Sequence, residues 1–178
     1  MVQVSANHNL PEIDTIWAWL DNVPDPEVPV VSVVDLGIVR DVHWEENELC
    51  VTVTPTYSGC PATAVIALDI ETALLKQGID KVRVETKLTP AWTTAWLSAK
   101  GREKLEAFGI APPQDDVGKA GAGACGIGKA DLSPPEAMHC PKCKSSNTRC
   151  VSWFGSTPCK AAYQCNDCLE PFDYFKCI

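Results

Sequence analysis

Two pairs of closely spaced cysteines near the C-terminus constrain the fold of this chain more than any other feature. Cys140 and Cys143 form the first C-x-x-C pair, twenty-one residues follow, and Cys165 and Cys168 form the second pair. Each pair can hold two sulfurs on one tight turn, and the segment between the pairs is long enough for a short β-hairpin. We therefore expect residues 138–178 to be a zinc ribbon, a unit too small to stay folded without its metal.

Three further cysteines in this segment, Cys150, Cys159 and Cys177, leave other chemistry open. They could be spare thiols, ligands of a second metal or parts of an Fe–S site, because tetrahedral sulfur sites suit zinc and iron alike. His139, next to the first pair, is a candidate substitute ligand. Redox dithiols or disulfides are the alternative to a metal, but a single C-x-x-C pair would support them better than two. We favour Zn²⁺ on the two pairs.

The composition predicts one ordinary domain plus a small module. The chain has 178 residues, of which 46% are hydrophobic, so a core can form. It contains no apolar run of about 18 residues that would span a membrane. Residues 1–11 lack the basic-then-apolar pattern of a signal peptide. We therefore expect a cytoplasmic protein, whose ten cysteines serve as thiols and metal ligands rather than as disulfides.

The charge is distributed unevenly along the chain, whose formal net charge is −8. Residues 1–137 carry 10 Lys and Arg against 20 Asp and Glu, whereas residues 138–178 carry 5 against 3. One Zn²⁺ bound by four thiolates would bring the second segment to a charge of about zero. A near-neutral ribbon on an acidic body lacks the basic surface that nucleic acids require, so we expect no nucleic-acid partner. The acidic body suits a basic protein surface, or it is simply a solvated face.

Hydrophobic periodicity predicts a small α+β domain over residues 1–110, with its helices on one face of a short sheet. The expected order is helix, strand, strand, helix, strand, helix, over residues 11–22, 38–44, 48–54, 61–77, 81–88 and 98–108. The first two strands form a hairpin. Residues 30–35 fit a strand or a short helical turn equally well. The glycine- and proline-rich residues 111–137 are expected to be a flexible linker.

Cys60 lies at a predicted strand-to-helix junction. Free N–H groups and the helix dipole favour a thiolate there, which is the form that binds iron or attacks a disulfide. Gly59 lets the backbone turn sharply and lets a partner approach. The alternative is a buried, inert cysteine, which is the interpretation we prefer for Cys50. No local motif pairs a histidine with Cys60 as a base, so we expect no catalytic residues and no enzyme.

A resemblance to a known family rests on two segments, Asp25-Pro-Glu-Val-Pro-Val-Val-Ser-Val-Val-Asp-Leu-Gly-Ile-Val-Arg40 and Pro55-Thr-Tyr-Ser-Gly-Cys60-Pro. These segments resemble the Fe–S assembly domains of the SufT and MIP-type targeting factors. Joined to a ribbon that ends Glu170-Pro-Phe-Asp-Tyr-Phe-Lys-Cys-Ile178, they make the chain similar to the PaaD family. Members of that family are accessory proteins encoded with the multicomponent phenylacetyl-CoA epoxidase of bacterial phenylacetate catabolism. The resemblance covers nearly the whole chain except the linker.

The resemblance implies that the protein helps to mature the epoxidase rather than taking part in its catalytic reaction. The epoxidase has a di-iron component and a reductase that carries an Fe–S cluster and flavin, and the accessory protein is implied to help insert iron or the cluster. On this chain the resemblance makes Cys60 the candidate ligand of iron or a cluster. Asp25, Glu27 and Asp35 match the acidic motif of the family and would offer oxygen ligands or orient a partner. Acids beside prolines also form turns, which is the alternative for these three residues.

The leading hypothesis is an accessory factor for iron or Fe–S cluster maturation of the epoxidase, with Zn²⁺ in the ribbon and a transient cargo at Cys60. Its expected partners are the reductase, the di-iron subunit, or both. The second hypothesis is a non-catalytic structural subunit of the oxygenase complex, because a flexible linker lets two modules grip one partner. A thiol oxidoreductase would need Cys60 or a metal-free C-x-x-C pair. A homodimer would let two Cys60 thiolates share one metal.

Overall fold

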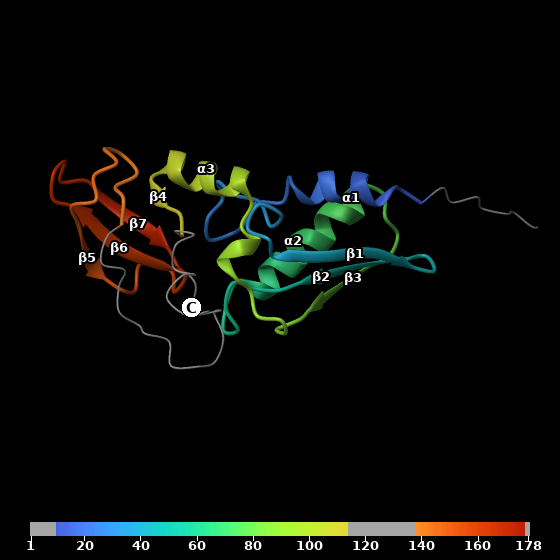
Figure 1. Ribbon diagram of the computed structural model, residues 1–178. Helices are drawn as coiled ribbons and strands as arrows, with labels where there is room; N and C mark the ends of the chain where they lie inside the picture. Colours follow the sequence, from blue (N-terminus) through green and yellow to red (C-terminus); the bar gives the residue numbers. More distant parts are fainter. Residues whose placement is uncertain (1–9, 114–137, 177–178) are drawn as a thin grey trace, which may run out of the picture.

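The computed structural model describes residues 10–113 and 138–176, which form two small sheets and three α-helices (Figure 1). In chain order the elements are α1 (Ile13–Leu20), β1 (Val39–Glu45), β2 (Glu48–Val53), α2 (Thr63–Lys76), β3 (Val82–Thr86), the 3₁₀ helix η1 (Thr94–Trp96), α3 (Ala99–Phe108), β4 (Ile110–Ala111), β5 (Thr148–Ser152), β6 (Lys160–Cys165) and β7 (Pro171–Phe175). The predicted order of the first six helices and strands is confirmed; η1 and β4 were not expected.

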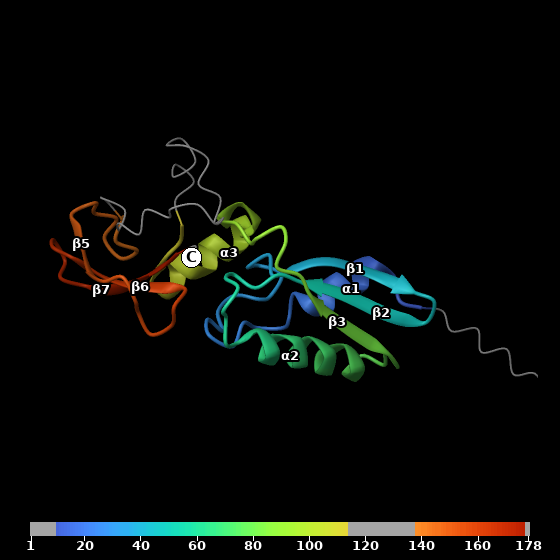
Figure 2. The same ribbon diagram turned by 90° about the horizontal axis from the view of Figure 1, so that it is seen from below.

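The first sheet has the strand order β1-β2-β3. The strands β1 and β2 pair as the predicted antiparallel hairpin, whereas β3 lies parallel to β2 because α2 carries the chain back along the sheet. Figures 1 and 2 show α1 and α2 on one face of this sheet, and α3 beyond its end, towards the second sheet. The α+β fold class is confirmed.

The main core lies between the first sheet and the helices α1 and α2, and it continues through the loop of residues 21–37 to α3. The inward side chains of β2 are those that the alternation predicts, namely Leu49, Val51 and Val53. The buried residues of α2 recur at every fourth position and are Ile66, Ile70 and Leu74. One stripe of the helix therefore packs on one face of the sheet. Cys50 and Thr52, on the opposite face of β2, are buried as well.

Residues 21–37 form an irregular loop between α1 and β1. Residues 30–35, for which the sequence allows a strand or a helical turn, form turns, and a single bridge joins Pro24 to Ser32. The loop ends at Gly37, whose φ of +65° lies in the left-handed region. A Cβ there would stand 2.3 Å from the carbonyl oxygen of Trp96, so this position requires glycine.

The second sheet has the order β4-β7-β6-β5. Its last three strands pair antiparallel as a ribbon, and β4 pairs parallel with β7, with Ile110 opposite Asp173 and Ala111 opposite Tyr174. Ala111, the first residue of the expected linker, therefore belongs to a strand. Most of that linker, residues 114–137, lies outside the described residues, as do Cys125 and Cys177.

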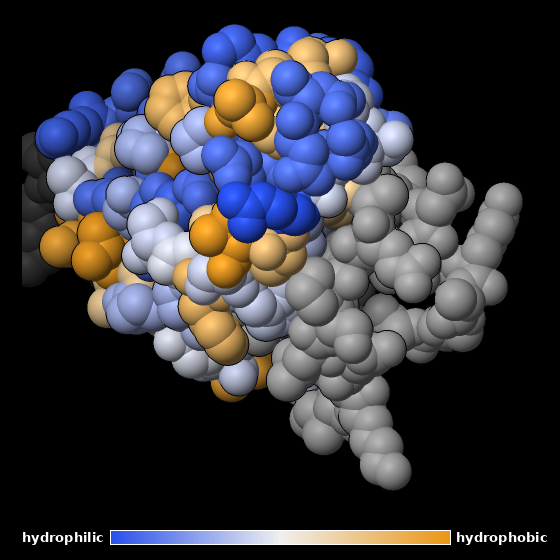
Figure 3. Space-filling view, turned by 90° about the vertical axis from the view of Figure 1, so that its left-hand side faces the viewer, coloured by the Kyte–Doolittle hydropathy of each residue, from blue (hydrophilic) through white to orange (hydrophobic). Residues whose placement is uncertain are grey.

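The ribbon packs against the first unit. It has a small core of its own, formed by Ala111, Met138, Cys140, Ala161, Tyr163, Cys165, Phe172 and Tyr174. Two of its side chains, Cys159 and Phe175, instead belong to the main core of the first unit. Figure 3, which views the ribbon end, shows separate small groups of hydrophobic residues among hydrophilic ones. Within the described ranges, no helix has the length and apolar character needed to cross a membrane.

Candidate metal centres

The four cysteines of the two C-x-x-C pairs converge on one point of the ribbon. Their sulfur atoms all lie within 4.8 Å of one another. The Sγ atom of Cys140 is 3.7 Å from that of Cys168, and the Sγ atom of Cys143 is 3.5 Å from that of Cys165. Four sulfurs bound to zinc at about 2.3 Å would stand about 3.8 Å apart, so this group fits a tetrahedral Zn²⁺ ion.

The same turn builds both halves of the zinc site. The residue after the second cysteine of each pair is left-handed, with a φ of 64° at Lys144 and 63° at Leu169. In the first pair the N–H of Cys140 donates to the carbonyl of Ser145, and the second pair repeats this closure from Cys165, both at 2.9 Å. The left-handed residue turns the chain back, so that both sulfurs of a pair face the same side.

A backbone group prepares one of these four sulfurs, that of Cys165, for a metal. The N–H of Cys168 lies 3.5 Å from Sγ of Cys165 and is the largest cause that lowers the pKa of Cys165 to about 7. Such a thiol is readily deprotonated near neutral pH, and zinc binds the thiolate. His139, the candidate substitute ligand, is exposed, and its Nδ1 faces the carbonyl oxygen of Lys144 at 3.3 Å. The structure therefore assembles a site of four sulfurs.

Cys60 lies in the loop between β2 and α2, three residues before the helix begins. Its side chain is half-buried and packs against the main core, whereas Gly59 beside it is exposed. A Cβ on Gly59 would meet only the ring of Tyr57, at 3.5 Å. The loop thus keeps the Cys60 thiol close to the surface.

The surroundings of Cys60 raise the pKa of its thiol. Burial is the largest cause, and the negative charges of Glu27 and Asp25 add to it. The N–H of Ala62 and the hydroxyl of Thr63 act in the opposite direction but do not prevail. The resting group is therefore a neutral thiol rather than the thiolate that its position before a helix led us to expect. A neutral thiol is a poor nucleophile, which disfavours a thiol oxidoreductase.

Asp25 and Glu27 contribute to this site in different ways. The Oδ1 atom of Asp25 accepts the N–H groups of Glu27 (2.9 Å) and Val28 (2.8 Å), so this buried carboxylate holds a turn. Burial is the main cause that raises the pKa of Asp25. The Oε2 atom of Glu27 instead lies 3.5 Å from Sγ of Cys159. Asp25 thus serves as a turn former, whereas Glu27 brings an oxygen to the Cys159 thiol.

Asp35 is buried and has partners elsewhere. Its carboxylate accepts the N–H of Ser32 (3.1 Å) and the hydroxyl of Ser98 (3.3 Å), and it pairs with Lys104. Burial alone would raise the pKa of Asp35, but Lys104 and Ser32 together lower it below its ordinary value. These contacts fix the start of α3 on the loop. Because none of them involves Cys60, we leave Asp35 out of the proposed site.

A second group of metal-binding residue types lies on the face of the first sheet opposite α1 and α2. Ligand atoms of His43, Glu45 and Cys50 lie within 4.8 Å of one another. The Arg83 guanidinium, however, lies 2.9 Å from Sγ of Cys50 and pairs with Glu45, so a positive charge already occupies the group. We therefore interpret it as an ion-pair network rather than a metal site.

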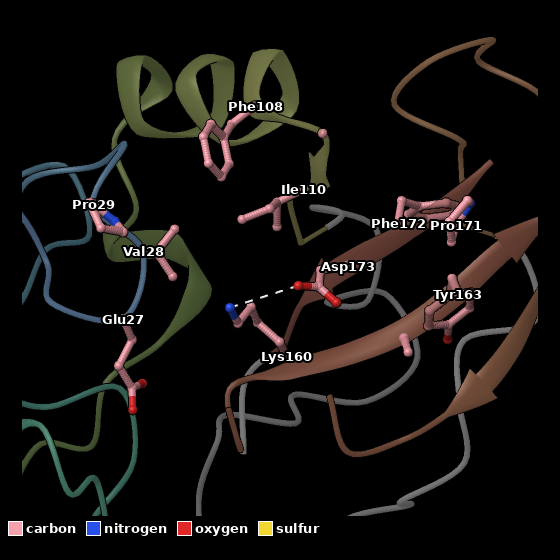
Figure 4. A pocket seen from close by; sticks show the side chains of 12 residues that line it. Glu27, Val28, Pro29, Phe108, Ile110, Lys160, Tyr163, Pro171, Phe172 and Asp173 are labelled. Carbon is pink, nitrogen blue, oxygen red and sulfur yellow. Dashed lines mark ion pairs between the residues drawn. The ribbon is translucent and has the colours of Figure 1, made fainter. Parts of the chain in front are cut away.

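A groove of about 380 Å³ lies where the two modules meet (Figure 4). Its walls come from the loop at Val28, the end of α3 at Phe108 and the ribbon sheet. Lys160 and Asp173 form an ion pair of 3.7 Å in it. Figure 4 shows Glu27 at its edge, with the carboxylate directed away from this ion pair.

Comparisons with known proteins match both modules. Residues 13–86 match the family described as iron-sulfur cluster assembly protein, and residues 128–176 match the PaaD zinc beta ribbon domain. A protein of Escherichia coli (strain K12), named as one subunit of a "Putative 1,2-phenylacetyl-CoA epoxidase", is 46% identical over 168 residues, which cover 94% of each chain. The chain belongs to the PaaD family.

Two further matches concern the first module of this PaaD-family chain. The "Fe-S protein maturation auxiliary factor YitW" of Bacillus subtilis (strain 168) is 33% identical over 88 residues, which are 49% of this chain and 82% of that protein. A crystal structure of the domain of unknown function DUF59 from Bacillus anthracis shares 30% identity at a TM-score of 0.49. It covers 52% of this chain and 89% of the other.

The sequence allowed Cys159 a place in a second metal or Fe–S site but did not indicate that it contacts Glu27 of the first module. Cys159 has no place in the zinc site, yet it is buried and faces Glu27. Strand alternation could have shown that Cys159 lies on the same face as Cys165, because six positions separate them. Nothing in the sequence indicates which residue of the first module it would face.

Proposed function

We propose that this chain is an accessory factor that helps to load iron or an Fe–S cluster into a component of a phenylacetyl-CoA epoxidase. Cys60 handles this cargo transiently. The observation that carries the proposal is the half-buried thiol of Cys60 in a surface loop, within the electrostatic influence of Glu27. The match of residues 13–86 to iron-sulfur cluster assembly proteins and the names of the two relatives support it.

The chain's own residues would bind, orient and release the cargo without turning over an organic substrate. Because the resting Cys60 is a neutral thiol, an incoming metal displaces its proton to solvent, and the reverse step releases the metal to the client. Among the described residues of the first module, one thiol near the surface serves this step, so the bond is readily exchanged. A reducing cytoplasm would keep that thiol free.

The zinc ribbon would dock the client. Its three most exposed large hydrophobic side chains, Val151, Phe154 and Leu169, are each more than half exposed. Zn²⁺, when bound by the four cysteines, supplies structural cross-linking to the ribbon and no chemistry at Cys60. The clients implied by the family resemblance are the Fe–S reductase and the di-iron subunit.

The test is the iron and sulfide content of the client reductase, purified from cells that carry the wild-type chain or Cys60→Ser. We expect the variant to fold normally and to leave the reductase depleted of both elements. Cys50→Ser, a buried cysteine on the other side of the sheet, is the matched control and should leave the reductase loaded. A fully loaded reductase and a fully loaded di-iron subunit with Cys60→Ser would overturn the proposal.

The word "subunit" in the name of the E. coli relative favours a second candidate, a structural subunit that remains bound to the oxygenase. Purification of the complex separates the two candidates. A stable one-to-one band for this chain, unaffected by Cys60→Ser, supports the structural subunit. A substoichiometric band that is lost during purification supports the maturation factor.

A further inference from the structure

Cys159 belongs to the ribbon but faces the first module. It immediately precedes β6, and its Sγ lies 3.5 Å from Oε2 of Glu27, although 132 positions separate the two residues. The hydroxyl of Thr157 lies 3.0 Å from the same sulfur. The side chain of Cys159 is only 3% exposed, and it is packed in the main core.

Cys60 shares the neighbours of Cys159. Both side chains pack on the main core, and the charges of Glu27 and Asp25 raise the pKa of both thiols. The pKa of Tyr57 is raised first by burial and then by the charges of Cys60, Glu27 and Cys159 together. Glu27 thus contacts Cys159 directly and acts on Cys60 through its charge, so this carboxylate is a neighbour that the two thiols have in common.

The ordinary role of a buried cysteine is that of a small hydrophobic side chain. That role does not explain why a partly buried carboxylate lies against the sulfur of Cys159, because a carboxylate loses solvation there and gains only a weak S–H donor. Burial is the largest cause that raises the pKa of Cys159 to about 12. Both thiols are thus protonated at rest. The packing role of Cys159 leaves the position of the Glu27 carboxylate unexplained.

We propose that Cys159 is the second sulfur ligand of the Cys60 site, so that a ferrous ion is held between the two modules by Cys60, Cys159 and Glu27. This inference rests on the proposed function, which a single cysteine would serve poorly. Two sulfurs and one oxygen form a donor set for a borderline divalent cation such as Fe²⁺. Binding displaces the two thiol protons to solvent, and the oxidation state of the iron does not change.

The charges nearby fit a site that gains negative charge when its thiols deprotonate. The N–H of Lys176 donates to the carbonyl of Cys159 (2.9 Å), and the Lys176 ammonium is sensitive to the charge of Cys159. The positive charge of Lys160, the residue after Cys159, acts to lower the pKa of Asp25. The three ligand atoms do not form one of the tight clusters found among the described residues, so Cys60 has to approach by side-chain rotation. Its half-buried place on a loop permits that rotation.

The test counts sulfur neighbours of iron. The full-length chain is first loaded with zinc, which blocks the four cysteines of the two C-x-x-C pairs. It is then mixed anaerobically with one equivalent of Fe²⁺ and studied by X-ray absorption at the iron edge. We expect two sulfur neighbours in the wild-type chain, one in Cys159→Ser, one in Cys60→Ser and none in the double variant. Cys50→Ser and Cys150→Ser are matched controls that should retain two.

The outcomes separate this inference from the function on which it rests. One sulfur neighbour in the wild-type chain, no bound iron, or an unchanged count in Cys159→Ser overturns the ligand role of Cys159. A depleted client with Cys60→Ser would still support the maturation role in those cases. Zinc content and the melting temperature show whether Cys159→Ser has folded, and the wild-type count decides the question if it has not.

Discussion

The indole ring of Trp92 meets the ring of Phe175 edge-on, with their centroids 6.1 Å apart and their planes at 76°. Trp92 precedes α3 in the first module, and Phe175 is the last residue of the last ribbon strand. Both side chains are 1% exposed, and the indole N–H donates to the carbonyl of Leu36 at 2.8 Å. The two modules therefore share one packed core rather than a loose contact.

Phe175→Ala should destabilise the first module as well as the ribbon. Removing a fully buried phenylalanine leaves a cavity, and we expect a loss of roughly 3–5 kcal/mol in the free energy of unfolding. Urea unfolding followed by tryptophan fluorescence and by circular dichroism checks this. Phe108→Ala, the same change at a side chain that is 63% exposed, is the control and should cost less than about 0.5 kcal/mol. A loss of less than about 0.5 kcal/mol in Phe175→Ala would show that the shared core does not stabilise the protein.

Cys165→Ser should remove the ribbon's zinc. The site depends on four sulfurs, and structural zinc contributes roughly 10–16 kcal/mol of binding free energy to the folding of small zinc modules. We expect less than one equivalent of zinc and a lower melting temperature for the whole chain, measured by elemental analysis and thermal denaturation. Cys150→Ser, a ribbon cysteine outside the group of four, should keep its zinc. Loss of zinc from both variants would contradict the assignment of the ligands.

Asp35→Asn should destabilise the protein by roughly 1–3 kcal/mol, because it removes the buried charged acceptor of the Ser32 N–H and the partner of Lys104. Since the folded-state pKa of Asp35 is lowered, its contribution is present above the pKa of the unfolded chain and is lost as the pH falls through the folded pKa. Lys104 lowers the pKa of Asp35 directly. Lys100 pairs with Asp21 and also interacts electrostatically with Asp35. Urea unfolding at a series of acidic pH values should therefore show a steeper acid loss in the wild type than in Asp35→Asn. Asp14→Asn, at an exposed position of α1, should retain the wild-type slope.

Two glycines should respond oppositely to the same substitution. Gly37→Ala places a Cβ 2.3 Å from a carbonyl oxygen at a φ of +65°, so we expect a loss of more than about 2 kcal/mol. Gly59→Ala meets only the Tyr57 ring at 3.5 Å and should stay within about 0.5 kcal/mol of the wild type. Chemical denaturation checks both. A stable Gly37→Ala chain would mean that the loop and η1 can separate without cost.

The elements of the first module could be predicted because their signals are local. The alternation at Leu49, Val51 and Val53 and the four-residue repeat of α2 follow from the side chains alone. The convergence of Cys140, Cys143, Cys165 and Cys168 could be predicted as well, because their spacing is a property of two turns. The left-handed residues that build those turns could not, since lysine and leucine do not favour that conformation.

The electrostatics of Cys60 could not be predicted from its position in the chain. A site before a helix favours a thiolate, but burial and two carboxylates from residues 25–27 outweigh the helix. Those carboxylates act from another loop, so their effect is a property of tertiary packing. The same holds for the contact between Glu27 and Cys159, which no local pattern connects.

β6 would join the two metal sites proposed for this chain. Cys165, its last residue, belongs to the zinc site, and Cys159 immediately precedes its first residue, so about 20 Å of one strand separates them. If Cys159 is a ligand of the cargo, a ribbon without zinc cannot present it, and zinc must be acquired before iron. A newly made or zinc-starved chain would then be incompetent as a carrier, and the zinc supply of the cell would limit how much iron reaches the client.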